Sequence, residues 1–232
     1  MQVQGTVLDL NLKLIISIRL RPERWLMVLD VKTAMLERHS IRKYKSDPVP
    51  DDMLQELLEA ARLAPSGTNH QPWRFIVVKN QGVKEKIQAA AFNQKFLSEA
   101  PVLLVCCADL STYAKNTRKR IQELIDSGAF GSEAFDSYPD IDKPIDPSAL
   151  KAFIPHAMLN VAIAVEHIAL RAVSLGLGTC WVQLMKAKKI AQILDLPEYI
   201  VITALLPVGF PNQSPSLRPR VGVKDIVYKV VE

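Results

Sequence analysis

The hydrophobic and polar positions of the chain follow both helical and strand periods, so the pattern predicts a fold that mixes α and β structure. Apolar residues three and four apart predict helices over 31–37, 51–64, 83–91, 148–174 and 186–194. Short apolar runs predict strands over 73–79, 102–108 and 200–208, and the tail ends in an extended stretch over 226–231. The regular β-α-β alternation of a dinucleotide-binding fold is missing, as are a G-x-G-x-x-G motif and a P-loop.

The predicted helix over 148–174 is apolar on nearly all sides, from Ala157 to Ala172. Such a helix must be buried on most of its faces. We therefore expect a central helix that a partner subunit helps to cover. Two of its residues, His156 and His167, are predicted to be core histidines.

Residues 111–148 differ from the rest of the chain because they combine many polar residues with scattered glycines and prolines. This composition predicts helical pieces joined by irregular chain. Long excursions of this kind are often lids or binding loops.

The N-terminal segment alternates apolar and other residues from Val7 to Leu20, which predicts a strand. Charged residues interrupt it and no small-residue cleavage site follows, so it does not resemble a secretory signal. It is also shorter than the ~20 apolar residues of a membrane span. Two interpretations stay open: an extra edge strand or swapped arm, or translation that begins at Met27. We accordingly divide the chain into an extension, 1–30, and a single domain, 31–232.

Composition narrows the class of protein. At 232 residues the chain fits one domain. The net charge is +5, but the basic residues are spread out, and the densest run, 115–120, has no interleaved aromatic residues and predicts a solvated helix face rather than a nucleic-acid site. The cysteines number three and show no C-x-x-C spacing, so neither a disulfide framework nor a metal site is predicted, and a cytoplasmic location is expected.

Two clusters carry candidate chemistry. The first, Arg38-His39-Ser40-Ile41-Arg42, offers two guanidinium groups and a hydroxyl, and arginine forms bidentate charge-assisted bonds to phosphate. The second, 65–73, is a loop of short polar residues that leads directly into an apolar strand. Together they predict a bound, phosphorylated cofactor whose phosphate site is built from side chains.

The chain resembles the nitroreductase family of FMN-dependent oxidoreductases from about Val31 to Val231. Six motifs in the family's order carry the resemblance: 38–42 with Tyr44, 65–73, Asn93-Gln94 before Ala100-Pro101, 175–181, 206–209 and Arg218-Pro219-Arg220. The resemblance implies a nitroreductase-like α+β fold, with a central mixed or antiparallel sheet flanked by helices. It also implies a homodimer with FMN at the subunit interface.

The resemblance also implies which residues bind FMN. Arg38 and Ser40 would bind the phosphate, and Arg42 would stabilise the reduced ring with its positive charge. The full implied set is Arg38, His39, Ser40, Arg42, Pro65, Ser66, Gly67, Asn69, Asn93, Val182, Gln183, Leu184, Arg218 and Arg220. Of these, 65–69 would come from the partner chain, and 182–184 would approach flavin N5.

The implied activity is reduction of nitroaromatic, quinone or related conjugated acceptors by NADH or NADPH in a ping-pong reaction. No catalytic acid–base residue is expected, because the flavin supplies the chemistry. The alternatives are a reductive dehalogenase, a flavin-destructase-like member of the same fold, and a flavin-binding protein without turnover. The candidates for contact with a small-molecule acceptor are His70, Tyr113 and Phe130; for the two aromatic residues, packing within the lid is the competing interpretation.

Overall fold

The computed structural model describes residues 29–137, 146 and 148–232. The predicted strand over 7–20, the question of a start at Met27 and the extension 1–30 (apart from its last two residues) lie outside the described residues.

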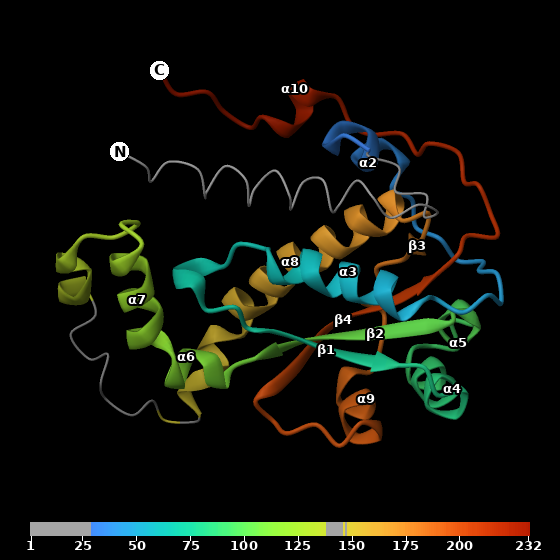
Figure 1. Cartoon of the computed structure of the whole chain (residues 1–232), viewed down its shortest axis with the longest axis horizontal. Coiled ribbons are helices and arrows are strands. Elements are labelled where there is room, and N and C mark those ends of the chain that lie inside the picture. Colours follow the sequence, from blue (N-terminus) through green and yellow to red (C-terminus); the bar gives the residue numbers. More distant parts are fainter. Residues whose placement is uncertain (1–28, 138–145, 147) are drawn as a thin grey trace, which may run out of the picture.

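A four-stranded antiparallel sheet forms the centre of the domain (Figure 1). Its order is β1 (Trp73–Val78), β2 (Val102–Asp109), β4 (Ile200–Gly209) and β3 (Gly178–Thr179). Every pairing is antiparallel, which resolves the mixed or antiparallel alternative. The predicted strands 73–79, 102–108 and 200–208 are confirmed within one residue at each end.

Helices cover both faces of this sheet. Alternate residues of the central strand β2 point to opposite sides, as the period of a strand requires. Leu104 and Cys106 pack against α3 (Asp51–Arg62) and α8 (Ile154–Ser174), whereas Leu103 and Val105 pack against α4 (Gln81–Ala90), α5 (Phe96–Glu99) and α9 (Ala187–Ile193). All eight residues of β2 are buried, so the apolar run in the sequence reflects a strand covered on both faces.

A bulge interrupts the pairing of β2 with β4. Cys106 pairs with Ala204 and Cys107 with Ile202, which leaves Thr203 as the extra residue. The bulge explains why Ile202 and Leu205, three positions apart, face the same side of the sheet. The side-chain oxygen of Thr203 is buried without a hydrogen-bond partner among the described residues.

The long apolar helix begins later than predicted. A 3-10 turn over Ala149–Phe153 precedes α8, which starts at Ile154 rather than near 148. Pro155 explains the difference, because proline fits the first turn of a helix but would break its interior. By length and composition the segment 149–174 would suffice to cross a membrane, but nine residues of α8 are buried within this domain.

The two histidines of α8 differ. His167 Nδ1 lies 3.2 Å from the carbonyl oxygen of Ala60 in α3, as expected of a core histidine. His156 is exposed, so its predicted place in the core is wrong. It lies in the first turn of α8, before the face that contacts the sheet begins.

The remaining elements are short. They are α2 (Val31–Glu37), the 3-10 turns Gly67–Asn69 and Ser132–Ser137, α6 (Ser111–Lys115), α7 (Thr117–Asp126) and α10 (Val223–Ile226). In the described part of 111–148 the helical pieces joined by irregular chain are confirmed. After β4 the C-terminal segment runs along the outside of the domain past α2 (Figure 1). The prediction of an extended stretch from 226 missed α10, which ends at Ile226.

Candidate flavin site

The Cys180 thiol marks the point where the basic residues of the predicted site meet. Burial raises the pKa of this thiol above its ordinary value. Four residues lower this pKa. Arg42, Arg218 and Arg38 act through their charges, and Ser40 acts through a hydrogen bond from its side chain. We call these four residues the arginine cluster; the guanidinium of Arg220 instead donates to the carbonyls of Arg218 and Pro219 in its own tail. Its members come from segments nearly 180 residues apart in the chain, and the structure brings them to one place.

Segment 38–42 lies beside the edge strand β3. The Ile41 amide donates a hydrogen bond to the Thr179 carbonyl at 2.9 Å, and Ser40 forms a parallel bridge with Thr179. Gly178 permits this approach, because a Cβ at that position would lie 2.6 Å from Cγ1 of Ile41. The glycine in the sequence is therefore a requirement of the close contact between the two segments.

Few acidic groups balance the arginine cluster. Arg38 pairs with Glu166, with Nε 3.4 Å from Oε1. Among residues 29–137, 146 and 148–232, no carboxylate pairs with Arg42, Arg218 or Arg220. Beside Arg38 lies a hollow of about 220 Å³, whose walls also include Glu37, His39 and Thr179, but not Arg42 or Arg218. Several guanidinium groups with one carboxylate among them fit a phosphate monoester, which supplies the missing negative charge.

A second pair of predicted segments meets beyond this cluster. The side-chain amide of Gln94 donates hydrogen bonds to the carbonyls of Ala91 and Leu184, both at 2.9 Å. These bonds place Asn93 next to 182–184. Asn93 has a positive φ of 55° and is exposed, and Gln183 and Leu184 are exposed as well.

Arg42 lies between the rest of the arginine cluster and the segments 93–94 and 182–184. Its guanidinium carbon lies 5.9 Å from the ring centroid of Phe96, a few residues after Asn93. The charge of Arg42 also acts on Cys180. One subunit thus places its cluster of basic side chains next to segments 93–94 and 182–184, in which Asn93, Gln183 and Leu184 are exposed, Gln94 is half-buried and Val182 is buried.

The polar loop after α3 has its own hydrogen-bond network. The Ser66 hydroxyl accepts a bond from the Gln71 amide at 2.9 Å, and the Gly67 amide donates to Oδ1 of Asn160 at 3.2 Å. Thr68, Asn69 and Gln71 have positive φ values of 48°, 50° and 49°. Such backbone conformations are uncommon outside glycine and cluster at functional sites.

This loop does not reach the arginine cluster of its own chain. It contacts α8 at Asn160, whereas Arg38 contacts α8 at Glu166, about 9 Å further along the axis and about a third of a turn around it. In Figure 1 the loop lies with α6 and α7 near one end of α8, and α2 and β3 lie near the other. Pro65, Ser66, Gly67 and Asn69 are therefore separated from Arg38 and Ser40 within one subunit.

The predicted acceptor residues lie in two different environments. His70 and Tyr113 are buried and their rings lie 4.3 Å apart between centroids; Tyr113 also stacks on Phe153 at 5.0 Å. Nδ1 of His70 has no partner among the described residues. Phe130 is 39% exposed. The packing interpretation thus describes Tyr113 in this subunit, and His70 faces the interior rather than an open surface.

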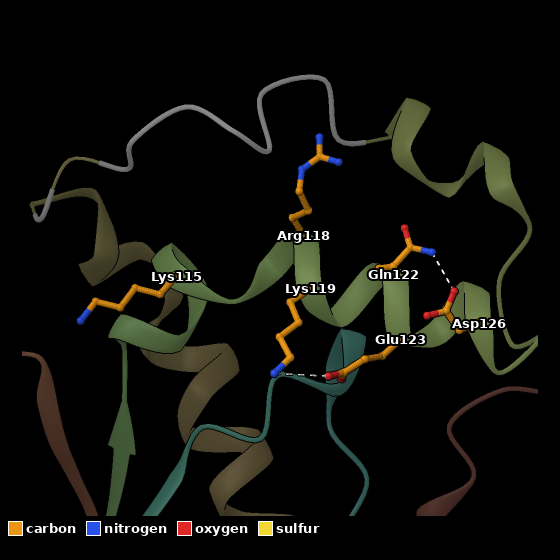
Figure 2. Close-up of a pocket in the computed structure, with 6 residues that line it drawn as sticks. All are labelled: Lys115, Arg118, Lys119, Gln122, Glu123 and Asp126. Carbon is orange, nitrogen blue, oxygen red and sulfur yellow. Dashed lines mark hydrogen bonds and ion pairs between the residues drawn. The ribbon is translucent and has the colours of Figure 1, made fainter.

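A larger hollow of about 620 Å³ lies along α6 and α7, and none of the residues that line it belongs to the arginine cluster; Figure 2 shows its lining. Its walls are charged and polar side chains, several of them bonded to one another: Lys119 to Glu123 at 3.9 Å and Gln122 to Asp126 at 2.8 Å. Ligand sites are mostly apolar with a few convergent polar groups. These bonds along one helix instead describe a solvated face, as predicted from the run 115–120.

Glu166 and Asn160 also organise these groups, and neither was predicted from the sequence; Gln94 was part of a predicted motif but was given no role. Glu166 carried the clearest signal, because an acidic residue within an otherwise apolar helix needs a partner. The roles of Gln94 and Asn160 could not be predicted, since each acts through a contact between segments more than 85 residues apart.

Comparison with known proteins shows the family of the chain. The model of the nitroreductase family matches residues 35–210. The NADH dehydrogenase of Thermus thermophilus is 36% identical over 83% of this chain and 92% of its own length. The FMN reductase (NAD(P)H) of Bacillus subtilis is 28% identical over 82% of this chain and 70% of its own length.

The fold is also that of solved structures. The crystal structure of an Exiguobacterium sibiricum protein in complex with FMN superimposes with a TM-score of 0.72, at 23% identity, over 88% of this chain and 98% of that one. Two relatives carry names of other activities, and both are 26% identical: the iodotyrosine deiodinase of Thermotoga neapolitana, over 79% of this chain and 90% of its own length, and the 5,6-dimethylbenzimidazole synthase of Rhodospirillum rubrum, over 76% and 80%.

Proposed function

The chain belongs to the nitroreductase family, and from that premise we propose that it is an FMN-dependent oxidoreductase. In this proposal NADH or NADPH is the electron donor, and nitroaromatic, quinone or related conjugated compounds are the acceptors. Donor and acceptor use one site in turn, as in a ping-pong reaction. Relatives named NADH dehydrogenase and FMN reductase support the reaction class.

The arginine cluster around Cys180 carries the proposal. Arg38, Arg42, Arg218 and the Ser40 hydroxyl lie near enough to the Cys180 thiol to act on its pKa, and Glu166 is the one carboxylate paired with a member of the cluster in the described chain. These groups would bind the FMN phosphate through charge-assisted hydrogen bonds. The guanidinium of Arg220 contacts the carbonyls of its own tail. Because Arg220 is two residues from Arg218, we propose that it joins the phosphate-binding groups when FMN binds.

The segments beyond the cluster would face the flavin ring. Asn93 offers an exposed side-chain amide, and 182–184 offer backbone groups held in place by Gln94. Arg42 would set its positive charge beside the ring, which favours the reduced, anionic form. FMN, when bound, would supply the hydride-transfer chemistry between NAD(P)H and the acceptor. The residues of the chain would bind the cofactor, orient its ring and polarise it.

A homodimer would complete the site. The polar loop 65–69 lies away from the arginine cluster of its own chain, so a second copy must supply it. The C-terminal tail supports the same arrangement, because it exposes large apolar side chains: Leu217, Val221, Val223, Ile226, Val227, Tyr228, Val230 and Val231. Contiguous apolar surface of this kind is typical of an interface between subunits.

The other activities of the family bear on the acceptor rather than on the cofactor. The relatives named deiodinase and synthase are both 26% identical to this chain, as is the Helicobacter pylori relative named oxygen-insensitive NADPH nitroreductase. Dehalogenation and flavin breakdown thus remain alternatives within the same fold, and a flavin-binding protein without turnover is a third. We also propose a cytoplasmic location, since all of the cysteines are free and buried.

Anaerobic reduction tests this proposal. Purified protein loaded with FMN is mixed with NADH or NADPH in the absence of oxygen while its visible spectrum is followed. Bleaching of the flavin bands, with recovery when a nitroaromatic or a quinone is added, is the expected result. A flavin that stays oxidised with both donors would contradict an NAD(P)H oxidoreductase and favour a binding protein. Steady turnover of many equivalents of NAD(P)H would exclude flavin breakdown.

A further inference from the structure

The carboxylate of Glu166 contacts two residues of the proposed site at once. One oxygen, Oε2, accepts a hydrogen bond from the Trp181 indole N–H at 3.0 Å. The other oxygen, Oε1, lies 3.4 Å from Nε of Arg38. Glu166 projects from α8, in the core of the domain, so a rigid element carries the carboxylate.

These two contacts join the two halves of the site. Arg38 is the residue at which α2 ends, and its backbone amide donates to the Ala34 carbonyl. Trp181 lies between the buried Cys180 and Val182, where the segment proposed to approach the flavin ring begins. Movement of Glu166 would therefore shift a phosphate-binding side chain and the ring-binding segment together.

Arg38 brings a group suited to phosphate into the reach of Glu166. A guanidinium has five N–H donors, and the edge formed by its two terminal nitrogens suits a bidentate contact with phosphate. Glu166 approaches this guanidinium on its Nε side, at 3.4 Å. Arg38 also lies near enough to the Cys180 thiol for its charge to oppose the effect of burial on the pKa of that thiol.

We infer that Glu166 is a positioning residue that orients Arg38 toward the flavin phosphate and holds Trp181 in register with it. The inference rests on the proposed function, since FMN is the ligand it concerns. The predicted effect on FMN affinity is opposite to the one expected from charge alone. A carboxylate near a phosphate would by charge alone weaken binding, so a residue that merely repels and a residue that positions make opposite predictions for its neutralisation.

The test compares FMN with riboflavin, which has the same ring without the phosphate. Dissociation constants for both flavins are measured by fluorescence quenching with full-length apoprotein, wild type and Glu166→Gln. Glutamine can still accept the Trp181 bond but loses the charge that pairs with Arg38. We expect FMN to bind about two- to fivefold more weakly and riboflavin to change less than about twofold.

Glu56→Gln is the matched control. Glu56 pairs with Arg171 at 2.8 Å, so this variant removes the same charge and breaks an ion pair to the same helix outside the site. Both flavins should bind it as they bind wild type. Urea unfolding of all the apoproteins checks that the fold is intact, and Trp181→Phe, which removes the hydrogen bond to Glu166 at the start of the ring-facing segment, should lower the affinity for FMN as well.

The possible results distinguish a failure of the role given to Glu166 from a failure of the proposed FMN site. Unchanged or tighter FMN binding by Glu166→Gln overturns the positioning role, as does an equal loss for FMN and riboflavin. Wild-type protein that binds FMN no better than riboflavin overturns the proposed phosphate site itself. A selective loss of FMN affinity in Glu166→Gln, absent in Glu56→Gln, supports both.

Discussion

The side-chain amide of Gln94 donates a hydrogen bond to the backbone carbonyl of Leu184 at 2.9 Å, across 90 residues of chain. A second bond from the same amide group, to the Ala91 carbonyl, fixes the rotamer of Gln94. One side chain thus holds together the two segments proposed to face the flavin ring, 93–94 and 182–184.

Substitution of Gln94 should loosen the ring site. We expect Gln94→Ala to lower the free energy of unfolding by about 1 kcal/mol, the net contribution of such hydrogen bonds. FMN and riboflavin should both bind more weakly, because the affected segments face the ring and not the phosphate. Urea unfolding and flavin titration measure the two effects. Gln81→Ala, which removes an exposed bond to Glu85 in α4, is the control, and flavin affinities unchanged by Gln94→Ala would contradict the role given to 182–184.

Gly178 is predicted to tolerate no side chain. In Gly178→Ala the new Cβ would lie 2.6 Å from Cγ1 of Ile41, so segment 38–42 must shift away from β3. Overpacking of this kind costs about 1–3 kcal/mol, and FMN affinity should fall with it because Arg38 and Ser40 lie in the displaced segment. Gly82→Ala in α4 is the matched control: its Cβ would meet its nearest neighbour at 3.5 Å, and no loss of stability or affinity is expected. A Gly178→Ala protein that binds FMN as tightly as wild type would contradict this prediction.

Asn160 connects the polar loop to the insert, and its two contacts can be removed separately. Its Oδ1 accepts from the Gly67 amide at 3.2 Å, and its Nδ2 donates to the Tyr113 hydroxyl at 3.1 Å. Tyr113→Phe removes one bond and keeps the ring stack, so we expect a loss of about 1 kcal/mol in unfolding free energy. Asn160→Ala also leaves the Gly67 amide unpaired, and a loss of about 2–3 kcal/mol follows. Equal effects of the two variants in urea unfolding would contradict this assignment.

His70 predicts a pH dependence of stability. Burial lowers the pKa of its imidazole from the ordinary value of 6.5; the charge of Arg120 adds to this effect, and a hydrogen bond with the Thr112 backbone opposes it. Above pH 6.5 the imidazole is neutral in both the folded and the unfolded chain, so its contribution to stability is fully present. As the pH falls below 6.5 the unfolded chain takes up the proton first, and stability declines until the lower, folded pKa is reached.

The measurement is urea unfolding between pH 7.5 and about 5. In His70→Phe, which keeps a ring to stack on Tyr113, the decline below pH 6.5 should become shallower by up to about 1.4 kcal/mol per pH unit. His156→Gln removes an exposed imidazole and should leave the decline as in wild type. A His70→Phe protein with the wild-type pH profile would show that His70 is not the titrating group.

The sequence predicted the parts of the fold whose signals are local. The apolar run of β2, the amphipathic period of α3 and the prolines and glycines that end elements all act within a few residues, and these elements lie where expected. Segment 38–42 was predicted as a phosphate site from its residue types alone, and the structure brings Arg38, Ser40 and Arg42 together with Arg218. Whether they bind FMN stays a prediction.

The rest depends on contacts that no local pattern encodes. The bulge at Thr203 changes which side of the sheet the residues of β4 face from that point on. A threonine within an apolar run gives no sign of a bulge in the sequence. The start of α8 at Ile154 was missed because the apolar period continues upstream of the proline that sets it. The burial of His70 against Tyr113 follows from how the insert folds over the loop, which neither segment indicates by itself.

The central claim is that the arginine cluster around Cys180 binds the phosphate of FMN, and the relative affinity for FMN and riboflavin tests it most directly. Titration of wild-type apoprotein with both flavins should give FMN at least about a hundredfold tighter binding, since two or more charge-assisted bonds distinguish them. Arg38→Ala should reduce that preference by about ten- to a hundredfold. Equal affinity for FMN and riboflavin in the wild-type protein, or no binding of either, would contradict the account.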